Sequence, residues 1–260
     1  MAMQELFSPL KVISKRTFFI LAFVEGVLAL LIWQLTAGEL IPTPAQVATA
    51  IVGILGTDYF YSNLVQSLAL IAEGMGISIA IALLVAYLSL IPVFKPVAEF
   101  VIKCRYLTLT GLIFFFTLIT SNGHNLKLSL LVFGIVPFFV TSLLSVIDSI
   151  NVQEYEMCRT LRMNSWRALL EVVIIGRFDL VLEVIRQNFA IAWIMITAVE
   201  GISMSEGGLG TMLIKSNKFI NVENSFAILM IVFLFGILFD YLLGVIRGWL
   251  FPYTKLQLLS

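Results

Sequence analysis

The feature that most constrains this chain is a series of apolar runs, each about as long as a helix that crosses a bilayer. They occupy residues 17–37, 64–91, 98–119, 126–147, 180–202 and 225–246. A helix needs about 20 mostly apolar residues to cross the hydrocarbon core. Because 60% of the 260 residues are hydrophobic and only 12% are charged, a water-soluble domain could not bury so much apolar side chain. The sequence therefore predicts an all-α membrane protein of about six transmembrane helices.

The intervals between these runs are short. Thr43 directly before Pro44 is typical of a helix start, and Val47, Ile51 and Ile54 would share one side of that helix. We therefore expect a short amphipathic helix after the first run. Residues 92–96 and 121–125 are expected to be turns, and the Gly-rich, polar residues 203–223 are expected to form a loop.

The basic residues are distributed unevenly over these intervals. If the N-terminus is cytoplasmic and six spans alternate, every Lys and Arg except Lys127, Lys215 and Lys218 falls on the cytoplasmic side. Cytoplasmic segments next to spans carry an excess of basic residues. We therefore expect a multi-pass protein with both termini in the cytoplasm: an N-terminal segment (1–16), a transmembrane domain (17–250) and a tail (251–260).

Residues 148–179 differ from the rest of the chain, because charged side chains alternate there with apolar ones. The pattern predicts amphipathic helices in the cytoplasm with an apolar ridge formed by Met157, Leu161, Trp166, Leu169 and Leu170. Such a segment can bind in the groove of a partner protein. It can also lie on anionic lipid.

The sequence contains no phosphate-binding loop, metal-ligand cluster or nucleophile triad. The lone His124 lies in an expected outer turn, where we interpret it as a surface or capping residue. The formal net charge is zero, which gives no indication of a nucleic-acid partner. We therefore expect no catalytic residues, no metal and no cofactor on this chain, so energy for any transport comes from a gradient or from another protein.

The charged segment resembles the cytoplasmic EAA loop of ABC-importer permeases, specifically the nitrate/sulfonate/taurine-type group. Glu156, Arg159, Thr160, Leu161 and Trp166 match that loop in register. Further matches extend over nearly the whole chain: Trp33, Pro42, Pro44, Ser67-Leu68, Gly74, Arg186, Trp193, Glu200, Gly208-Leu209-Gly210, Gly236 and Asp240.

The resemblance implies a permease subunit of an ABC importer in the bacterial inner membrane. Its partners would be a second permease, expected to be an identical copy, ABC ATPase subunits that bind ATP and Mg, and an external solute-binding protein. The coupling loop (about 148–179) would dock into the ATPase, with Glu156, Arg159 and Trp166 at the centre of the contact. Substrates of similar permeases are small, often anionic solutes.

One position departs from the family pattern, because Arg162 stands where the loop usually has glycine. If that position takes a left-handed backbone conformation, an arginine there costs about 1–2 kcal/mol.

Four carboxylates fall within or at the edge of expected spans: Glu25, Glu73, Glu200 and Asp240. An ionised carboxylate in hydrocarbon is costly, so each should meet protein, water or a partner. We expect structural roles for Glu200 and Asp240, whereas Glu25 and Glu73 could contact a neighbouring subunit or a substrate. The carboxylates also leave open a gradient-driven secondary transporter or channel, and the departure at Arg162 leaves open an accessory membrane subunit.

Overall fold

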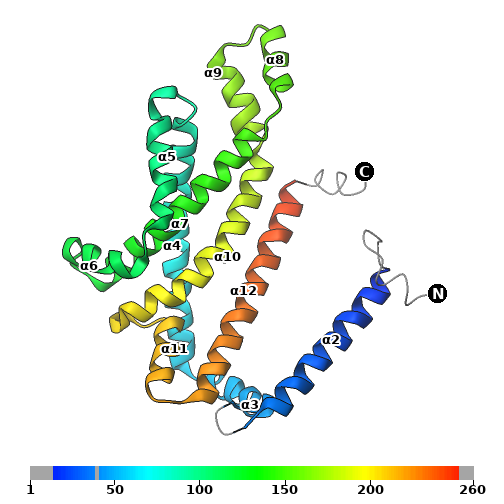
Figure 1. Cartoon of the computed structure of the whole chain (residues 1–260), viewed down its shortest axis with the longest axis vertical. Coiled ribbons are helices and arrows are strands. Elements are labelled where there is room, and N and C mark those ends of the chain that lie inside the picture. Colours follow the sequence, from blue (N-terminus) through cyan, green and yellow to red (C-terminus); the bar gives the residue numbers. More distant parts are fainter. Residues whose placement is uncertain (1–13, 39–40, 252–260) are drawn as a thin grey trace.

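The computed structural model describes residues 14–38 and 41–251, and these residues are helical without any strand (Figure 1). The longer helices are α2 (Lys15–Thr36), α4 (Asp58–Leu88), α7 (Gly123–Asp148), α10 (Phe178–Ile202) and α12 (Val222–Leu250). The shorter ones are α3 (Pro44–Leu55), α5 (Lys95–Lys103), α6 (Leu109–Ile119), α8 (Val152–Thr160), α9 (Ser165–Ala168) and α11 (Leu209–Lys218), with η1 (Pro92–Phe94), η2 (Cys104–Tyr106), η3 (Leu169–Ile175) and η4 (Met204–Glu206) between them.

Five of the described helices are long and apolar enough to cross a membrane, and a bent pair makes a sixth candidate. The predicted fold class is therefore confirmed. Helix α7 is central: it packs against α4 on one side and α10 on the other, and α10 in turn contacts α11 and α12. Small residues permit this close approach, since a Cβ at Gly74 would lie 2.6 Å from the side chain of Leu131.

Helix α2 stands apart from this bundle and joins it through α3 (Figure 1). None of its apolar window is buried inside the chain. At its end, Trp33 stacks on Phe226 and donates a hydrogen bond to the carbonyl of Pro42 over 3.0 Å. The short helix expected after this point is present as α3, which begins with a capping box between Thr43 and Gln46.

The expected third span, 98–119, is not one continuous helix. The segments Pro92–Tyr106 and Leu109–Ile119 are bent by 112°. The helix is interrupted because Leu107 and Thr108 have extended backbone conformations, with ψ of 129° and 135°. Apolar composition could not reveal this break, because both arms are apolar.

The expected loop over 203–223 is also wrong, since it contains helix α11. Gly207 and Gly208 have positive φ angles of 78° and 113° and turn the chain into that helix. Gly210 then allows α11 to pack directly on α10, where an added Cβ would lie 2.2 Å from the carbonyl oxygen of Thr197. Other boundaries differ as well: α4 begins at Asp58 rather than 64, α7 begins at Gly123 inside the expected turn, and α12 is Val222–Leu250 rather than 225–246.

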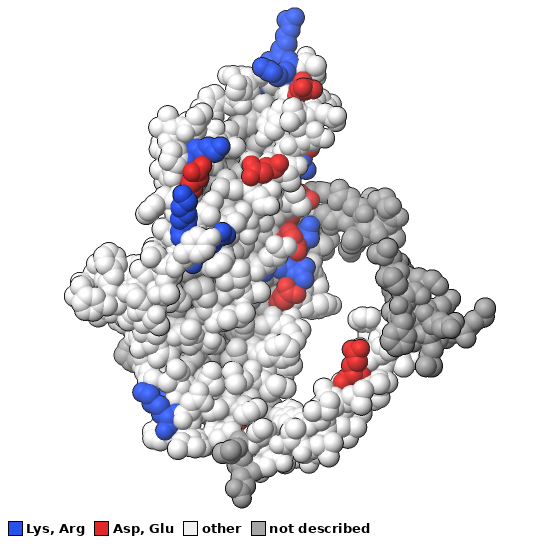
Figure 2. All heavy atoms as spheres, viewed as in Figure 1, with Lys and Arg blue, Asp and Glu red and all other residues white. Residues whose placement is uncertain are grey.

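The bundle has two distinct ends. One, here called the α8–α9 end, carries α8, α9 and the start of α5, and the opposite end carries α3 and the α11–α12 junction (Figure 1). On the side drawn in Figure 2, charged side chains gather toward the α8–α9 end and along the neighbouring parts of the bundle. The lower part of the bundle is largely uncharged on that side, as expected for a surface that faces lipid.

The contact at Gly210 gives a first prediction. Gly210→Ala should destabilise the chain by about 3 kcal/mol, because the new methyl group meets backbone rather than a movable side chain. Thermal unfolding in detergent measures the effect. The control is Gly53→Ala in α3, where nothing lies within 4 Å and the change should be neutral or stabilising. Equal melting temperatures for the two variants would contradict the direct packing of α11 on α10 at Gly210.

Candidate functional site

Helices α8 and α9 form a compact hairpin beyond the end of the bundle (Figure 1). Asn151 caps α8, since its side chain accepts a hydrogen bond from the Gln153 amide over 3.2 Å. The predicted amphipathic helices are therefore present at residues 152–168, here called the α8–α9 segment.

The outer surface of the α8–α9 segment is apolar and exposed. Met157, Leu161 and Trp166 are 66%, 60% and 62% exposed. The remaining predicted coupling residues, Glu156, Arg159, Thr160 and Arg162, are exposed as well. Large apolar side chains rimmed by charges are typical of a docking surface.

The inner surface of the segment is fixed to the bundle. Cys158 packs with Ile150, Val172 and Val173 in a small core of its own. Arg177, just before α10, forms an ion pair with Glu154 of α8. Burial raises the pKa of the neighbouring Tyr155 hydroxyl, and the Glu154 carboxylate raises it further. The segment therefore presents its apolar residues on a supported platform.

The turn between α8 and α9 places Arg162 in the left-handed region, with φ of 53°. The amide of Arg162 donates to the Arg159 carbonyl over 3.0 Å, and the amide of Met163 donates to the Cys158 carbonyl over 3.0 Å. These two bonds form a Schellman motif, in which the left-handed position is usually glycine. The turn is thus kept although its usual residue is absent.

The α8–α9 segment leads almost without interruption into a span. Helix α9 continues into the π-helix η3, and only a short turn at Gly176-Arg177 separates η3 from α10. π-helical stretches often accompany functional sites in helices, and η3 lies directly between the α8–α9 segment and α10.

Asp240 lies in α12 and pairs with Arg186 of α10. Two hydrogen bonds of 2.8 Å connect the guanidinium to the two carboxylate oxygens. Glu183 extends the cluster, because it accepts a 2.6 Å hydrogen bond from Arg247 and lies 3.7 Å from Arg186. Bidentate pairs of this kind fix geometry as well as charge. The cluster joins α10 to α12 near the α8–α9 end.

Glu200 is 1% exposed and holds the start of α11. Its carboxylate accepts a 2.6 Å hydrogen bond from the Ser67 hydroxyl and a 2.8 Å hydrogen bond from the Gly210 amide. Ser67 in turn accepts from the Leu209 amide, and Asn63 accepts from the Gly208 amide. The first amides of α11 are thus satisfied by buried side chains of α4 and α10, with a negative charge at the helix N-terminus.

Lys127 of α7 completes this arrangement, here called the α11 clamp (Asn63, Ser67, Lys127, Glu200 and Gly207–Thr211). It is 3% exposed and donates a 3.0 Å hydrogen bond to the Gly207 carbonyl. Its charge also interacts with Glu200. A Cβ at Gly208 would lie 2.3 Å from the carboxylate carbon of Glu200, so no larger residue fits without movement. The clamp therefore connects four helices through one buried polar network.

The remaining two carboxylates lie elsewhere. Glu73 in α4 is hydrogen-bonded to His124 of α7, with 2.9 Å between Oε2 and Nε2. Glu25 is exposed on the surface of α2 and forms no ion pair among the described residues. The structure thus places each of the four predicted acidic residues in a different environment.

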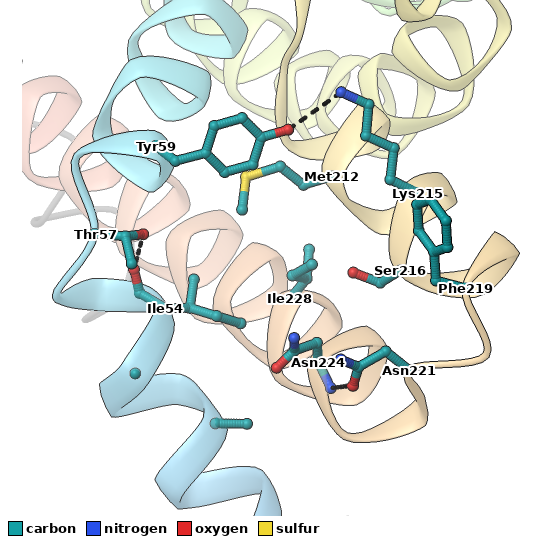
Figure 3. A pocket seen from close by; sticks show the side chains of 12 residues that line it. Ile54, Thr57, Tyr59, Met212, Lys215, Ser216, Phe219, Asn221, Asn224 and Ile228 are labelled. Atoms are coloured by element: carbon teal, nitrogen blue, oxygen red, sulfur yellow. Dashed lines mark hydrogen bonds between the residues drawn. The ribbon is translucent and has the colours of Figure 1, made fainter.

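A cavity of about 440 Å³ opens at the end opposite the α8–α9 segment. It lies between α3, α4, α11 and α12, and Figure 3 shows Lys215 reaching across its rim to Tyr59. Their Nζ and hydroxyl oxygen are 3.3 Å apart. Amide and hydroxyl groups of Asn221, Asn224 and Ser216 also line it, so the cavity offers polar contacts at the far end of the molecule.

Sequence reasoning missed Lys127, Asn63 and Arg247. A lysine inside an apolar run is itself a signal, since such a charge needs a buried partner. The pairing of Ser67 with Gly208-Leu209-Gly210 was not foreseen either, although the same residues carried the family resemblance.

The Schellman turn gives a second prediction. Arg162→Gly should stabilise the turn by about 1 kcal/mol, because glycine adopts positive φ without the steric cost. Hydrogen exchange of the Arg159–Met163 peptide should become about fivefold slower. The comparison variant Arg159→Gly lies inside α8, where glycine is unfavourable, and its exchange should become faster.

The α11 clamp gives a third prediction. Glu200→Gln should destabilise the chain by about 2–3 kcal/mol, because the amide nitrogen that replaces one carboxylate oxygen cannot accept the hydrogen bond that this oxygen receives, and because Lys127 loses the charge of Glu200. Thermal unfolding in detergent measures the loss. Glu223→Gln, an exposed carboxylate in the first turn of α12, should cost less than about 1 kcal/mol. Similar losses for both variants would show that burial of Glu200 has no special role.

No family model matches the chain, and no curated protein matches it. Among solved structures, it is similar to a chain of an amino acid ABC transporter described as determined "with histidines". The TM-score is 0.63 and the sequence identity is 21%; the match covers 76% of this chain and 96% of that chain. The two proteins therefore share a fold, a helical membrane architecture found in an ABC transporter.

Proposed function

We propose that this chain is the membrane-spanning permease subunit of an ABC importer. The observation that carries the proposal is the α8–α9 segment, whose exposed Met157, Leu161 and Trp166 form an apolar surface outside the bundle. The shared fold with an ABC transporter chain supports it. So does the sequence resemblance to the nitrate/sulfonate/taurine-type permeases.

In this proposal the α8–α9 segment docks into a groove of an ABC ATPase subunit, which binds the ATP and Mg. Trp166 and Leu161 are the apolar anchors, and Glu156, Arg159 and Thr160 form the polar rim. Closure of two ATPases draws two segments together. Because α9 leads through η3 into α10, this movement reaches the bundle and opens the solute path to the outside.

The remaining parts of the assembly follow the same proposal. A second copy of the chain completes the solute path, and an external solute-binding protein delivers a small solute of the kind that such permeases carry, often an anion. The protein lies in the bacterial inner membrane, with the α8–α9 end and both termini, residues 1–16 and 251–260, in the cytoplasm. No bond is made or broken on this chain.

A gradient-driven transporter is the alternative class. It would use Glu25 or Glu73 rather than an ATPase, and neutralising either carboxylate would abolish transport. An accessory subunit would keep the fold without binding an ATPase. Binding of the ATPase therefore separates the importer from both alternatives.

The fourth prediction tests that binding. In detergent, the chain should co-purify with an ABC ATPase from its own organism. Trp166→Ala and Glu156→Ala should weaken the complex at least about tenfold, because each truncates the centre of the docking surface. Affinity is measured by titrating labelled ATPase against the purified chain.

Tyr61→Ala is the matched control, since Tyr61 is an exposed aromatic residue near the start of α4, at the end of the bundle opposite the α8–α9 segment. Its affinity for the ATPase should be unchanged. If the wild type purifies alone, or if both docking variants bind as tightly as the control, the importer assignment fails.

A further inference from the structure

His124 connects three elements that are distant in the sequence. Its Nε2 lies 2.9 Å from Oε2 of Glu73 in α4, and its Nδ1 lies 3.7 Å from Oε2 of Glu206 in η4. His124 itself is the second residue of α7. One imidazole is thus placed between two carboxylates that come from opposite sides.

This cluster is open to its surroundings, although it belongs to the membrane-spanning part of the chain. The side chains of His124, Glu73 and Glu206 are 43%, 46% and 41% exposed. Glu73 lies near the middle of α4, and ionisable groups at such a depth face water or protein rather than lipid. The imidazole is therefore accessible from outside the chain.

The other charged groups around His124 come from α7 and α10. Lys127 lies one turn further along α7 and interacts electrostatically with Glu200 and Glu206. It also donates a hydrogen bond to the Gly207 carbonyl. Helix α6 contains no ionisable residue. Helix α5 and η2 contain the charged residues Lys95, Glu99, Lys103 and Arg105. None of these four forms an ion pair with His124 among the described residues.

We infer that Glu73, His124 and Glu206 form a proton-binding site that latches the η4 turn to α4 and α7. The protonated imidazolium has an N–H on both nitrogens, so it can donate a hydrogen bond to Glu73 and direct its other N–H toward Glu206 across the 3.7 Å ion-pair distance. The neutral ring has a single N–H. When that proton serves Glu73, the Nδ1 lone pair points toward Glu206 and the contact becomes repulsive.

The location of the site determines what its protonation does. Glu206 directly precedes Gly207, whose carbonyl accepts the hydrogen bond from Lys127 in the α11 clamp. A cation near the N-terminus of α7 is unfavourable by itself, so the charged ring depends on both carboxylates. Binding of a proton therefore fixes η4 and the entry to α11, and its release loosens them.

If the chain is an importer permease as proposed above, this site makes opening of the bundle sensitive to the pH of the solute path. The site itself does not depend on that assignment. It requires only that the three side chains share a proton-accessible surface.

The fifth prediction uses hydrogen exchange of the full chain in lipid nanodiscs, without ATPase or solute. Exchange of the amides in residues 203–209 is compared at about pH 5.5 and about pH 8.0, on either side of the range in which histidine titrates, and is corrected for intrinsic rates. In the wild type the corrected exchange should be about tenfold faster at the higher pH. His124→Gln should remove this difference, because glutamine takes up no proton.

Glu206→Gln serves as a second variant and should also remove the difference, while Asp58→Asn, an exposed carboxylate at the start of α4, should retain it. Equal protection of the wild type at both pH values would overturn the latch. So would a difference that persists in His124→Gln or in Glu206→Gln. Because no ATPase is present, these outcomes are independent of the co-purification test, which decides the proposed function alone.

Discussion

The buried carboxylate of Glu200 is the contact on which the arrangement of the far half of the bundle depends. It accepts hydrogen bonds from Ser67 of α4 and from the Gly210 amide, and its charge is complemented by Lys127 of α7. Without it, the Gly210 amide in the first turn of α11 would lose its hydrogen-bond acceptor, and the buried Lys127 would keep Glu206 but lose Glu200 of its two acidic neighbours. One side chain therefore fixes how α10 turns back into α11 and where both lie against α4 and α7.

Helix α10 links this clamp to the α8–α9 segment. At one end it continues from η3 and α9, and in its middle Trp193 donates a 2.9 Å hydrogen bond to the Val232 carbonyl of α12. Arg186 of α10 adds a bidentate ion pair with Asp240 of α12. Because these contacts tie α10 to α12 at two levels, the proposed displacement of Trp166 by an ATPase would move α10 and α12 together rather than one span alone.

Sequence reasoning was most successful where one physical property decided the outcome. Long apolar runs predicted α7, α10 and α12, because length and polarity alone determine whether a helix can cross hydrocarbon. The start of α3 followed from the capping residue Thr43. The break at Leu107 and Thr108 was missed because neither residue is a distinctive helix breaker, and α11 was missed because its glycines were interpreted as a loop. The contact of His124 with Glu73 depends on how α4 packs against α7, which no local pattern encodes.

The clamp also determines when the start of α7 meets its partners during synthesis. Lys127 lies in α7, and Glu200 lies in α10. The helical elements α8, α9 and η3 are synthesised between α7 and α10. Lys127 is the fifth residue of α7, so its charge enters the membrane near the end of the helix, where it costs less than the about 2.5–3.5 kcal/mol of a lysine at the helix centre. Until α10 has been made, Lys127 lacks Glu200, and until η4 follows it also lacks Glu206 and the Gly207 carbonyl. The start of α7 therefore meets its final partners only after α10 and η4 have been synthesised.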